Sequence, residues 1–315
     1  MKSMYHHLIL CITAAVLLSL STSFAQAQHS QSVVEPGAEL VKLADGFSFA
    51  EGPVSDSAGN LWFSDYGNDK IHYFSAHGTL QTVIENVGGP IGLYFDKSGT
   101  LYICSAKDHR IKKLPRIANN PATIPDAELT LNSYSDRFEG NLFNSPNDIW
   151  VDSKGGVYFT DPRFAPLPEE VEQDGFHIYY ILPGSKKIIR AAEDLNKPNG
   201  IVGSPDGKIV YVTDTPEDKT FVYTVQEDGG LTDKRLFANE GYDGMTVDSL
   251  GNVYSAMQNS IEVYDPDGKK LDSIPVPDKP NNVCFGGVDG KTLFITARVS
   301  VYSLRMRIPG LKTGL

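Results

Sequence analysis

Cysteine, basic clusters and long apolar runs are all scarce in this sequence, and each scarcity excludes a class of protein. Only three cysteines occur in 315 residues, too few for a scaffold held together by disulfides. The formal net charge is −11, with acidic and basic residues interspersed. This charge argues against binding to nucleic acid or to an anionic membrane surface, and it is compatible with a cationic partner such as a metal ion.

The one long apolar run lies at the N-terminus. Residues Leu8 to Leu20 follow a lysine at position 2 and precede Ala25-Gln26-Ala27. This pattern predicts a secretory signal peptide over residues 1–27, cleaved after Ala27. A membrane anchor is the alternative, but the run is shorter than the roughly 20 residues that a span needs. The mature protein is therefore expected to be exported to a periplasm or the cell exterior, with residues 28–36 as a flexible leader and no membrane partner.

Cleavage would remove one of the three cysteines. The other two, Cys104 and Cys284, both lie inside apolar strand patterns. Buried free thiols are the state that this placement favours. A single disulfide is the alternative in an oxidising compartment.

Convincing helical periodicity is also missing, and a repeat runs through the chain instead. Each copy has a polar or proline-containing start, an apolar strand, a turn with Asp or Ser before Gly, a second strand, and often Ser/Thr-Asp. The copies begin at residues 53, 90, 146, 198, 243 and 280. Further strand patterns between the copies, closed by Gly, Asp and Ser turns, bring each repeat to four strands.

Six four-stranded antiparallel repeats predict an all-β protein, a six-bladed β-propeller that forms a single domain over residues 37–315. The ring is expected to close when an N-terminal strand within Gly37 to Asp45 pairs with the last repeat. A pair of β-sandwiches is the alternative, but it does not explain six matching starts. The irregular stretch from Ile117 to Asn141 is expected either to cover the entrance as a lid or to be a surface excursion.

The first strand of each blade should line the central channel, so that its first residue faces the channel mouth. These first residues are Glu51, Pro90, Asn147, Asn199, Asp243 and Asn281. Four of them carry side-chain oxygen at equivalent or nearly equivalent positions: Glu51, Asn147, Asn199 and Asp243. Oxygen ligands at one level of a narrow channel predict a hard divalent cation. Calcium fits best and magnesium or manganese are alternatives, whereas zinc is less favoured because no His or Cys stands at these positions.

A simpler interpretation exists for each of these residues taken singly. Asn and Asp before Gly are common in turns for backbone reasons. Glu51 is different because Glu is a poor turn former, and carboxylates that face a dry channel need a counter-charge. A cation that only clamps the ring remains the alternative to a catalytic cation.

At these positions the sequence resembles the gluconolactonase, regucalcin (senescence marker protein) and luciferin-regenerating-enzyme-like family. The motifs that carry the resemblance are Ala50-Glu51-Gly52-Pro53, Asn147-Asp148, Pro198-Asn199-Gly200 and Asp243-Gly244-Met245, which occur in the family's order within Leu40 to Tyr302. The resemblance implies that Glu51, Asn199 and Asp243 ligate one divalent cation, usually calcium. It also implies that Asn147 lies beside the cation and helps to hold substrate or water. Ser145 stands where some members carry a sugar-contacting arginine, so the substrate is expected to differ accordingly.

The resemblance implies lactone hydrolysis, and the chemistry of the predicted site agrees with it. A cation can polarise the carbonyl of a sugar-type lactone such as gluconolactone, and water is the nucleophile. Asp243 is the catalytic candidate, either as a general base or as a ligand only. No Gly-x-Ser-x-Gly motif occurs, so a serine hydrolase is not supported.

Specificity is expected from residues that follow the second strand of each blade and ring the entrance. They are Tyr66, Asp108, His109, Arg163, Gln258 and Arg298. Arg163 is the preferred substrate contact because a guanidinium grips hydroxyl or carboxylate oxygens, and a solvated surface arginine is the alternative. Two other functions stay open: a non-catalytic ligand-binding propeller with a structural calcium, and a metal-dependent hydrolase of another ester class. The sequence leaves the oligomeric state open.

Overall fold

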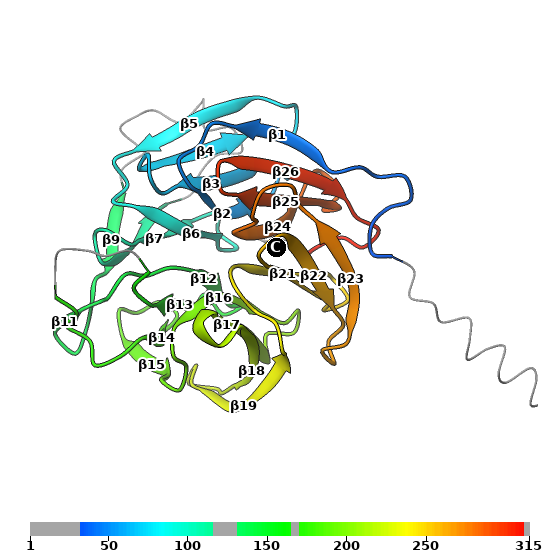
Figure 1. The fold of residues 1–315 in the computed structure, drawn as a ribbon. Coiled ribbons are helices and arrows are strands. Elements are labelled where there is room, and N and C mark those ends of the chain that lie inside the picture. The colour runs from blue at the N-terminus through cyan, green and yellow to red at the C-terminus, as the bar shows by residue number, and fades with distance from the viewer. Residues whose placement is uncertain (1–31, 116–130, 165–169, 312–315) are drawn as a thin grey trace, which may run out of the picture. The chain divides into compact units, whose positions relative to one another are not determined.

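The computed structural model describes residues 32–115, 131–164 and 170–311. The predicted signal peptide, residues 1–27, lies outside these residues. From Val34 onward the strands form six four-stranded antiparallel sheets around a common axis (Figure 1). This arrangement confirms the predicted six-bladed β-propeller. In the described part of the chain, no helix is long and apolar enough to cross a membrane.

Each blade is named here from its innermost to its outermost strand. The first two blades contain β2 (Ala50–Ser55), β3 (Leu61–Asp65), β4 (Lys70–Phe74) and β5 (Leu80–Glu85), then β6 (Pro90–Phe95), β7 (Leu101–Ser105), β8 (Arg110–Leu114) and β9 (Asn132–Ser135). The third and fourth contain β12 (Ile149–Val151), β13 (Val157–Asp161), β14 (His177–Ile181) and β15 (Ile188–Ala192), then β16 (Pro198–Gly203), β17 (Ile209–Asp214), β18 (Lys219–Val225) and β19 (Leu231–Ala238). The fifth contains β20 (Met245–Val247), β21 (Val253–Ala256), β22 (Ser260–Tyr264) and β23 (Lys270–Pro275).

The sixth blade closes the ring with an N-terminal strand, as the sequence predicts. Its strands are β24 (Asn282–Gly286), β25 (Thr292–Ala297), β26 (Ser300–Arg305) and β1 (Val41–Asp45). The outermost strand β1 pairs antiparallel with β26, with Lys42 opposite Tyr302. The pairing begins before residue 37, because Val34 bridges to Met306 and the Glu35 amide donates to Arg305 O.

The turns between the two inner strands explain the recurrent Asp and Gly of the repeat. Asp56 Oδ1 accepts hydrogen bonds from the amides of Ala58 and Asn60 at 3.0 and 2.9 Å. Gly59 completes this turn with a φ of 84°, a left-handed conformation that glycine adopts without steric cost. The same bonds recur at Asp96 and Asp152. These turns lie at the opposite ends of the inner strands from the predicted site, so they serve the fold.

Apolar and aromatic side chains fill the space between neighbouring blades. The largest fully buried ones include Trp62, Tyr158 and Tyr254. Cys104 and Cys284 are both buried free thiols, as their strand patterns predict.

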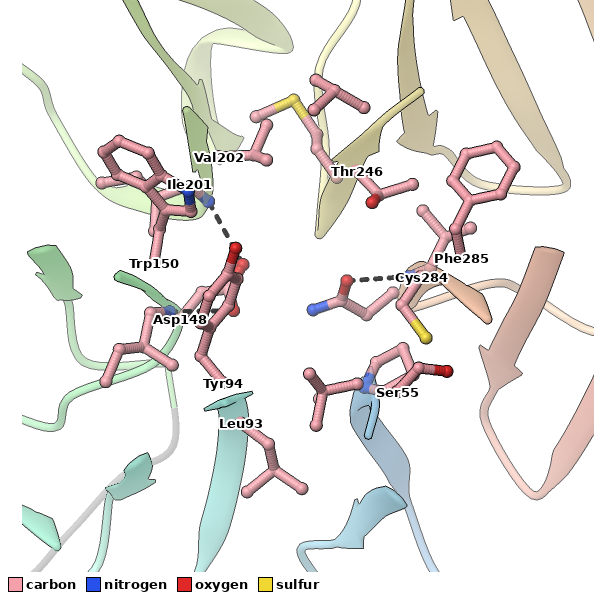
Figure 2. A pocket seen from close by; sticks show the side chains of 18 of the residues that line it. Ser55, Leu93, Tyr94, Asp148, Trp150, Ile201, Val202, Thr246, Cys284 and Phe285 are labelled. Atoms are coloured by element: carbon pink, nitrogen blue, oxygen red, sulfur yellow. Dashed lines mark hydrogen bonds between the residues drawn. The ribbon is translucent and has the colours of Figure 1, made fainter. Parts of the chain in front are cut away.

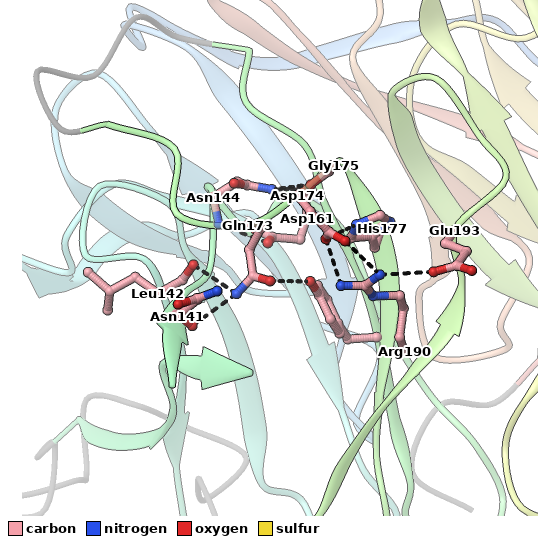
Figure 3. Close-up of polar contacts among 11 residues, drawn as sticks. Asn141, Leu142, Asn144, Asp161, Gln173, Asp174, Gly175, His177, Arg190 and Glu193 are labelled. Atoms are coloured by element: carbon pink, nitrogen blue, oxygen red, sulfur yellow. Dashed lines mark hydrogen bonds and ion pairs between the residues drawn. The ribbon is translucent and has the colours of Figure 1, made fainter. Parts of the chain in front are cut away.

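The described part of the irregular stretch belongs to the scaffold. Residues 132–135 form β9, and a short hairpin of β10 (Arg137–Phe138) and β11 (Asn141–Leu142) follows it. Figure 3 shows how Gln173 holds this hairpin against the third blade, with its Nε2 donating to Asn141 O at 2.9 Å and Leu142 O at 3.0 Å. Residues 116–130, where most of the predicted lid falls, lie outside the described residues.

Candidate functional site

A cavity of about 570 Å³ lies at the channel mouth, where the first strands of the blades begin. Its lining is Ser48, Phe49, Glu51, Tyr66, Gly67, Ile91, Ser145, Asn147, Phe164, Asn199, Thr215, Tyr242, Asp243, Lys279, Asn281 and Arg298. All four predicted oxygen donors are therefore in one cavity, although Glu51 and Asp243 are 192 positions apart in the sequence.

Three Ser/Thr-Asp pairs at the ends of second strands fix the loops that carry these donors. Asp65 accepts hydrogen bonds from the amides of residues 48 and 49, Asp161 from those of 144 and 145, and Asp214 from those of 196 and 197. Each aspartate thus holds the segment that leads into its own blade's first strand. Because the three carboxylates are nearly inaccessible to water, these charge-assisted bonds hold the segments firmly.

The hydroxyl of each pair reaches the next blade along the ring. Ser64 Oγ donates to Ile91 O at 2.7 Å, Thr160 Oγ1 to Asn199 O at 2.7 Å, and Thr213 Oγ1 to Asp243 O at 3.0 Å. Two of the acceptors are the backbone oxygens of predicted site residues. The recurrent Ser/Thr-Asp dipeptide therefore positions one site residue within its blade and the next one across the blade boundary.

The first strands of neighbouring blades approach each other closely at the site, and the glycines that follow Asn199 and Asp243 permit this approach. A β-carbon on Gly200 would collide with Asp243 O, and one on Gly244 would collide with the side chain of Asn282. Both glycines have ordinary backbone angles rather than a positive φ. Asn-Gly and Asp-Gly are thus close-packing devices here, not the turn motifs that the simpler interpretation of the sequence suggested.

The two buried amides of the site differ in how they are held. Asn199 Nδ2 donates to Thr215 Oγ1 and to Tyr242 O, both at 3.2 Å, which leaves Asn199 Oδ1 available as a ligand. The side chain of Asn147 makes no hydrogen bond with the described residues, although Asn147 is buried, with only 8% of its surface exposed. It lines the cavity. A polar group in this state is suited to binding a ligand, because leaving it unpaired is costly.

The two carboxyl groups of the site repel each other and are shielded from water. Burial raises the pKa of Glu51 well above its usual value, and the charges of Asp243 and Asp148 raise it further. Burial likewise raises the pKa of Asp243 to about 7, while the nearby Lys279 lowers it. A bound cation would stabilise both ionised forms, because an opposite charge at close range offsets the cost of burial.

Beneath this cavity the channel narrows to a space of about 60 Å³ that is largely apolar. Figure 2 shows side chains from several blades meeting there, including Leu93, Trp150 and Val202. Asp148 also points into this space, and its two oxygens accept hydrogen bonds from the amides of Ile149 and Ile201 at 2.9 and 3.1 Å. Asp148 thus joins the third and fourth blades below the site and is not one of the cavity-lining residues.

Comparison with known proteins shows the family to which the chain belongs. The model of the SMP-30/Gluconolactonase/LRE-like region matches residues 49–299, most of the described chain. The chain belongs to this family. The match includes every predicted donor, from Glu51 to Asp243.

Similar members of the family include enzymes named for lactones. A gluconolactonase of Zymomonas mobilis is 25% identical over 310 residues, covering 89% of this chain and 84% of that protein. A lactonase of Staphylococcus epidermidis is 28% identical over 268 residues, covering 81% of this chain and 76% of that protein. The solved structure of a gluconolactonase from Xanthomonas campestris aligns with a TM-score of 0.78 at 28% identity, covering 87% of this chain and 91% of that one.

Only two of the six predicted entrance residues line the cavity. Tyr66 and Arg298 line the cavity, whereas Asp108, His109 and Gln258 do not. Arg163 is not among the lining residues either, and it donates to Asn144 O at 3.4 Å. Burial raises the pKa of the nearby Asp161 to about 7, and the charge of Arg163 offsets part of this rise. His109 is buried, and its Nδ1 donates to the carbonyls of residues 143 and 144 at 3.0 and 2.8 Å, which is a packing role.

Sequence reasoning missed Lys279 as a site residue. Its signal is weak because the tripeptide Lys-Pro-Asn occurs twice, at Lys197 and at Lys279. Lys197 Nζ lies over the ring of Phe164 at 4.7 Å and is outside the cavity lining, whereas Lys279 Nζ lies over the ring of Tyr242 at 3.8 Å and faces the cavity.

Asp214→Ala tests whether the Ser/Thr-Asp pairs position the site. Loss of the acceptor for two amides should free the segment that carries Asn199, and kcat/KM should fall by about ten- to a hundredfold, the scale of a small misplacement of binding groups. Steady-state kinetics on a lactone, with circular dichroism to verify folding, would measure this. Asp96→Ala is the matched control, because Asp96 holds two amides at a turn remote from the cavity. Equal kinetic losses in both variants would contradict the positioning role.

Proposed function

We propose that this protein is a hydrolase that opens lactones with the help of a divalent cation, calcium in the first place. The observation that carries the proposal is the convergence of Glu51, Asn147, Asn199 and Asp243 in one cavity of a chain that belongs to this family. Relatives named gluconolactonase and lactonase support the reaction class. Gluconolactone is the substrate with which to begin.

The donor set fits a hard cation on chemical grounds. Glu51 and Asp243 supply carboxylate oxygen, and Asn199 supplies amide oxygen because its nitrogen is engaged elsewhere. Calcium prefers such all-oxygen sets. The described residues contain no group of three or more His, Cys, Asp or Glu side chains that could hold a metal ion, so the proposed set relies on amide oxygen besides the two carboxylates.

The reaction follows from the placement of these groups. When bound, a divalent cation supplies Lewis-acid polarisation of the lactone carbonyl. Asp243 takes a proton from a water molecule as the water oxygen bonds to the carbonyl carbon. The ring C–O bond then breaks, and the proton returns from Asp243 to the departing ring oxygen, which leaves an open-chain hydroxy acid.

Asn147 and Glu51 have supporting roles in this scheme. The unpaired amide of Asn147 can donate to a substrate oxygen and accept from a hydroxyl, and so orients the lactone. Glu51 Oε2 is held by the amide of Gly52 at 2.8 Å, which fixes this carboxylate in the channel mouth without a partner of opposite charge. Its ionised form is therefore expected when a cation is present.

A panel of sugar lactones tests the function directly. Acid release from gluconolactone should be rapid with calcium and should fall to background with a chelator, and calcium should restore it. Turnover that is unaffected by thorough chelation would contradict the metal dependence. Calcium binding at full occupancy with no hydrolysis of any lactone or ester would instead identify a non-catalytic binding propeller.

We propose export on the sequence of residues 1–27 alone, which has the features of a cleaved secretory signal. The substrate is then a small lactone available in the periplasm or outside the cell.

A further inference from the structure

Two basic side chains line the cavity, and the hydrolysis scheme gives them no role. Lys279 is half-buried and Arg298 is exposed, and both line the cavity. In the described part of the chain neither forms an ion pair with a carboxylate. Each lies over an aromatic ring instead: Lys279 Nζ is 3.8 Å from the ring centre of Tyr242, and Arg298 Cζ is 5.5 Å from that of Phe49.

The charge count of the cavity changes when a cation is bound. Its charged lining residues are Glu51, Asp243, Lys279 and Arg298, so the lining is neutral when all four are ionised. If the two carboxylates hold a divalent ion, as the proposed function requires, the two basic side chains have no counter-charge. Basic groups in a partly dehydrated cavity then favour an anionic ligand.

A tight hairpin places the side chain of Arg298 at the cavity. Arg298 is the first residue of the two-residue loop between β25 and β26, where Ala297 pairs with Ser300. Its φ is 50°, a left-handed conformation that glycine adopts more readily than arginine. The loop is too short to carry the guanidinium away from the channel mouth, and Arg298 lines the cavity.

Lys279 and Arg298 also lie on a different side of the ring from Ser145, the position at which some family members carry a sugar-contacting arginine. Ser145 lines the cavity from the third blade, and it cannot pair with a carboxylate as a cation would. Lys279 and Arg298 come from segments that lead into and out of the inner strands of the sixth blade. A negatively charged substituent would therefore be held near that blade.

We propose that the substrate is a lactone that carries a separate anionic group, namely the lactone of a sugar diacid, whose carboxylate is bound by Lys279 and Arg298. This proposal rests on the proposed lactone hydrolysis and narrows its substrate class. A planar guanidinium and an ammonium together suit a carboxylate, because the first can bind both oxygens and the second supplies a further charge-assisted hydrogen bond.

Kinetics with two lactones test the proposal. Glucaro-1,4-lactone carries a free carboxylate, whereas glucono-1,4-lactone has the same ring and no charge. The wild-type protein should prefer the anionic lactone in kcat/KM, and Lys279→Met and Arg298→Gly should each reduce that preference by about tenfold or more, the scale of one lost charge-assisted hydrogen bond. Arg298→Gly should melt at or above the wild-type temperature, since glycine suits the left-handed backbone. Lys113→Met is the matched control, because Lys113 Nζ also lies over an aromatic ring, that of Tyr134 at 4.7 Å, and neither residue lines the cavity.

Calorimetry with glucarate and with sorbitol, calcium in excess, gives a readout independent of turnover. Glucarate should bind, sorbitol should not, and both cavity variants should weaken glucarate binding about tenfold while Lys113→Met should not. Hydrolysis of both lactones with equal kcat/KM and an equal loss in each variant would overturn the anionic substrate and leave the hydrolase intact. If neither lactone is opened, the hydrolase proposal fails, and glucarate binding alone then decides whether the anion site exists.

Discussion

Asp243→Asn is expected to lower kcat/KM for lactone hydrolysis at least about a hundredfold, the scale of a lost general base, while the protein stays folded. The substitution keeps an oxygen at this position but removes the group that takes the proton from water. Asp243 is suited to that task because it lines the cavity beside the other predicted donors. Burial raises the pKa of its carboxyl to about 7 in the metal-free protein, and a bound cation would favour the ionised form that accepts a proton. Steady-state kinetics and circular dichroism on the same sample would measure both outcomes.

A second measurement separates the two roles of Asp243. Calorimetry should show that Asp243→Asn still binds calcium, with an affinity reduced by no more than about tenfold if base catalysis dominates the loss of rate. Asp265→Asn is the matched control: Asp265 Oδ1 accepts from the amides of residues 267 and 269 in a turn outside the cavity, and asparagine keeps that oxygen. Unchanged turnover in Asp243→Asn would remove this residue from the mechanism.

Calcium at about a hundred times its Kd is expected to stabilise the fold by about 2.7 kcal/mol, which raises Tm by about 5 °C for a domain of this size. The reason is that the cation binds side chains that only the folded ring brings together. Glu51→Gln should remove about half of this increase or more, because it removes one of the two carboxylates and weakens the site by about tenfold or more. A thermal melt of each protein with calcium and with chelator measures it. An equal rise in wild type and Glu51→Gln would contradict the assigned ligand set.

The stabilisation by calcium should depend on pH in a defined direction. The pKa values of Glu51 and Asp243 are raised in the folded state, so these groups stabilise the metal-free fold below their unfolded pKa values and lose that contribution as pH rises through the folded ones. The metal-free protein should therefore lose this stability between about pH 5 and pH 8. The increase in Tm with calcium should be largest at pH 8 and small at pH 5, where protons compete with the cation.

Much of the fold was predictable from sequence because its signals are local. The Asp-x-x-Gly turn seen at Asp56 recurs in four of the six repeats and the Ser/Thr-Asp pair in three. Their hydrogen bonds lie within one blade or between neighbours. The pairing of β1 with the last blade was predictable because the ring leaves one strand position open there. The role of the Asn-Gly and Asp-Gly dipeptides could not be predicted from sequence, because a turn and a close contact between blades both favour these residues.

The sequence by itself determined the number of blades and the closing strand. It also predicted that Glu51, Asn147, Asn199 and Asp243 meet at the channel mouth, and the structure places all four in one cavity, because the register of each blade's sheet fixes where its first strand begins. The tertiary structure alone decided which basic residues face the cavity. Arg163 follows a second strand on a connection from Asp161 to His177 and lies outside the lining, whereas Arg298 is on a two-residue loop and faces inward. Loop length and the packing of the neighbouring blade set the direction of such a side chain, and neither is a property of a short sequence motif.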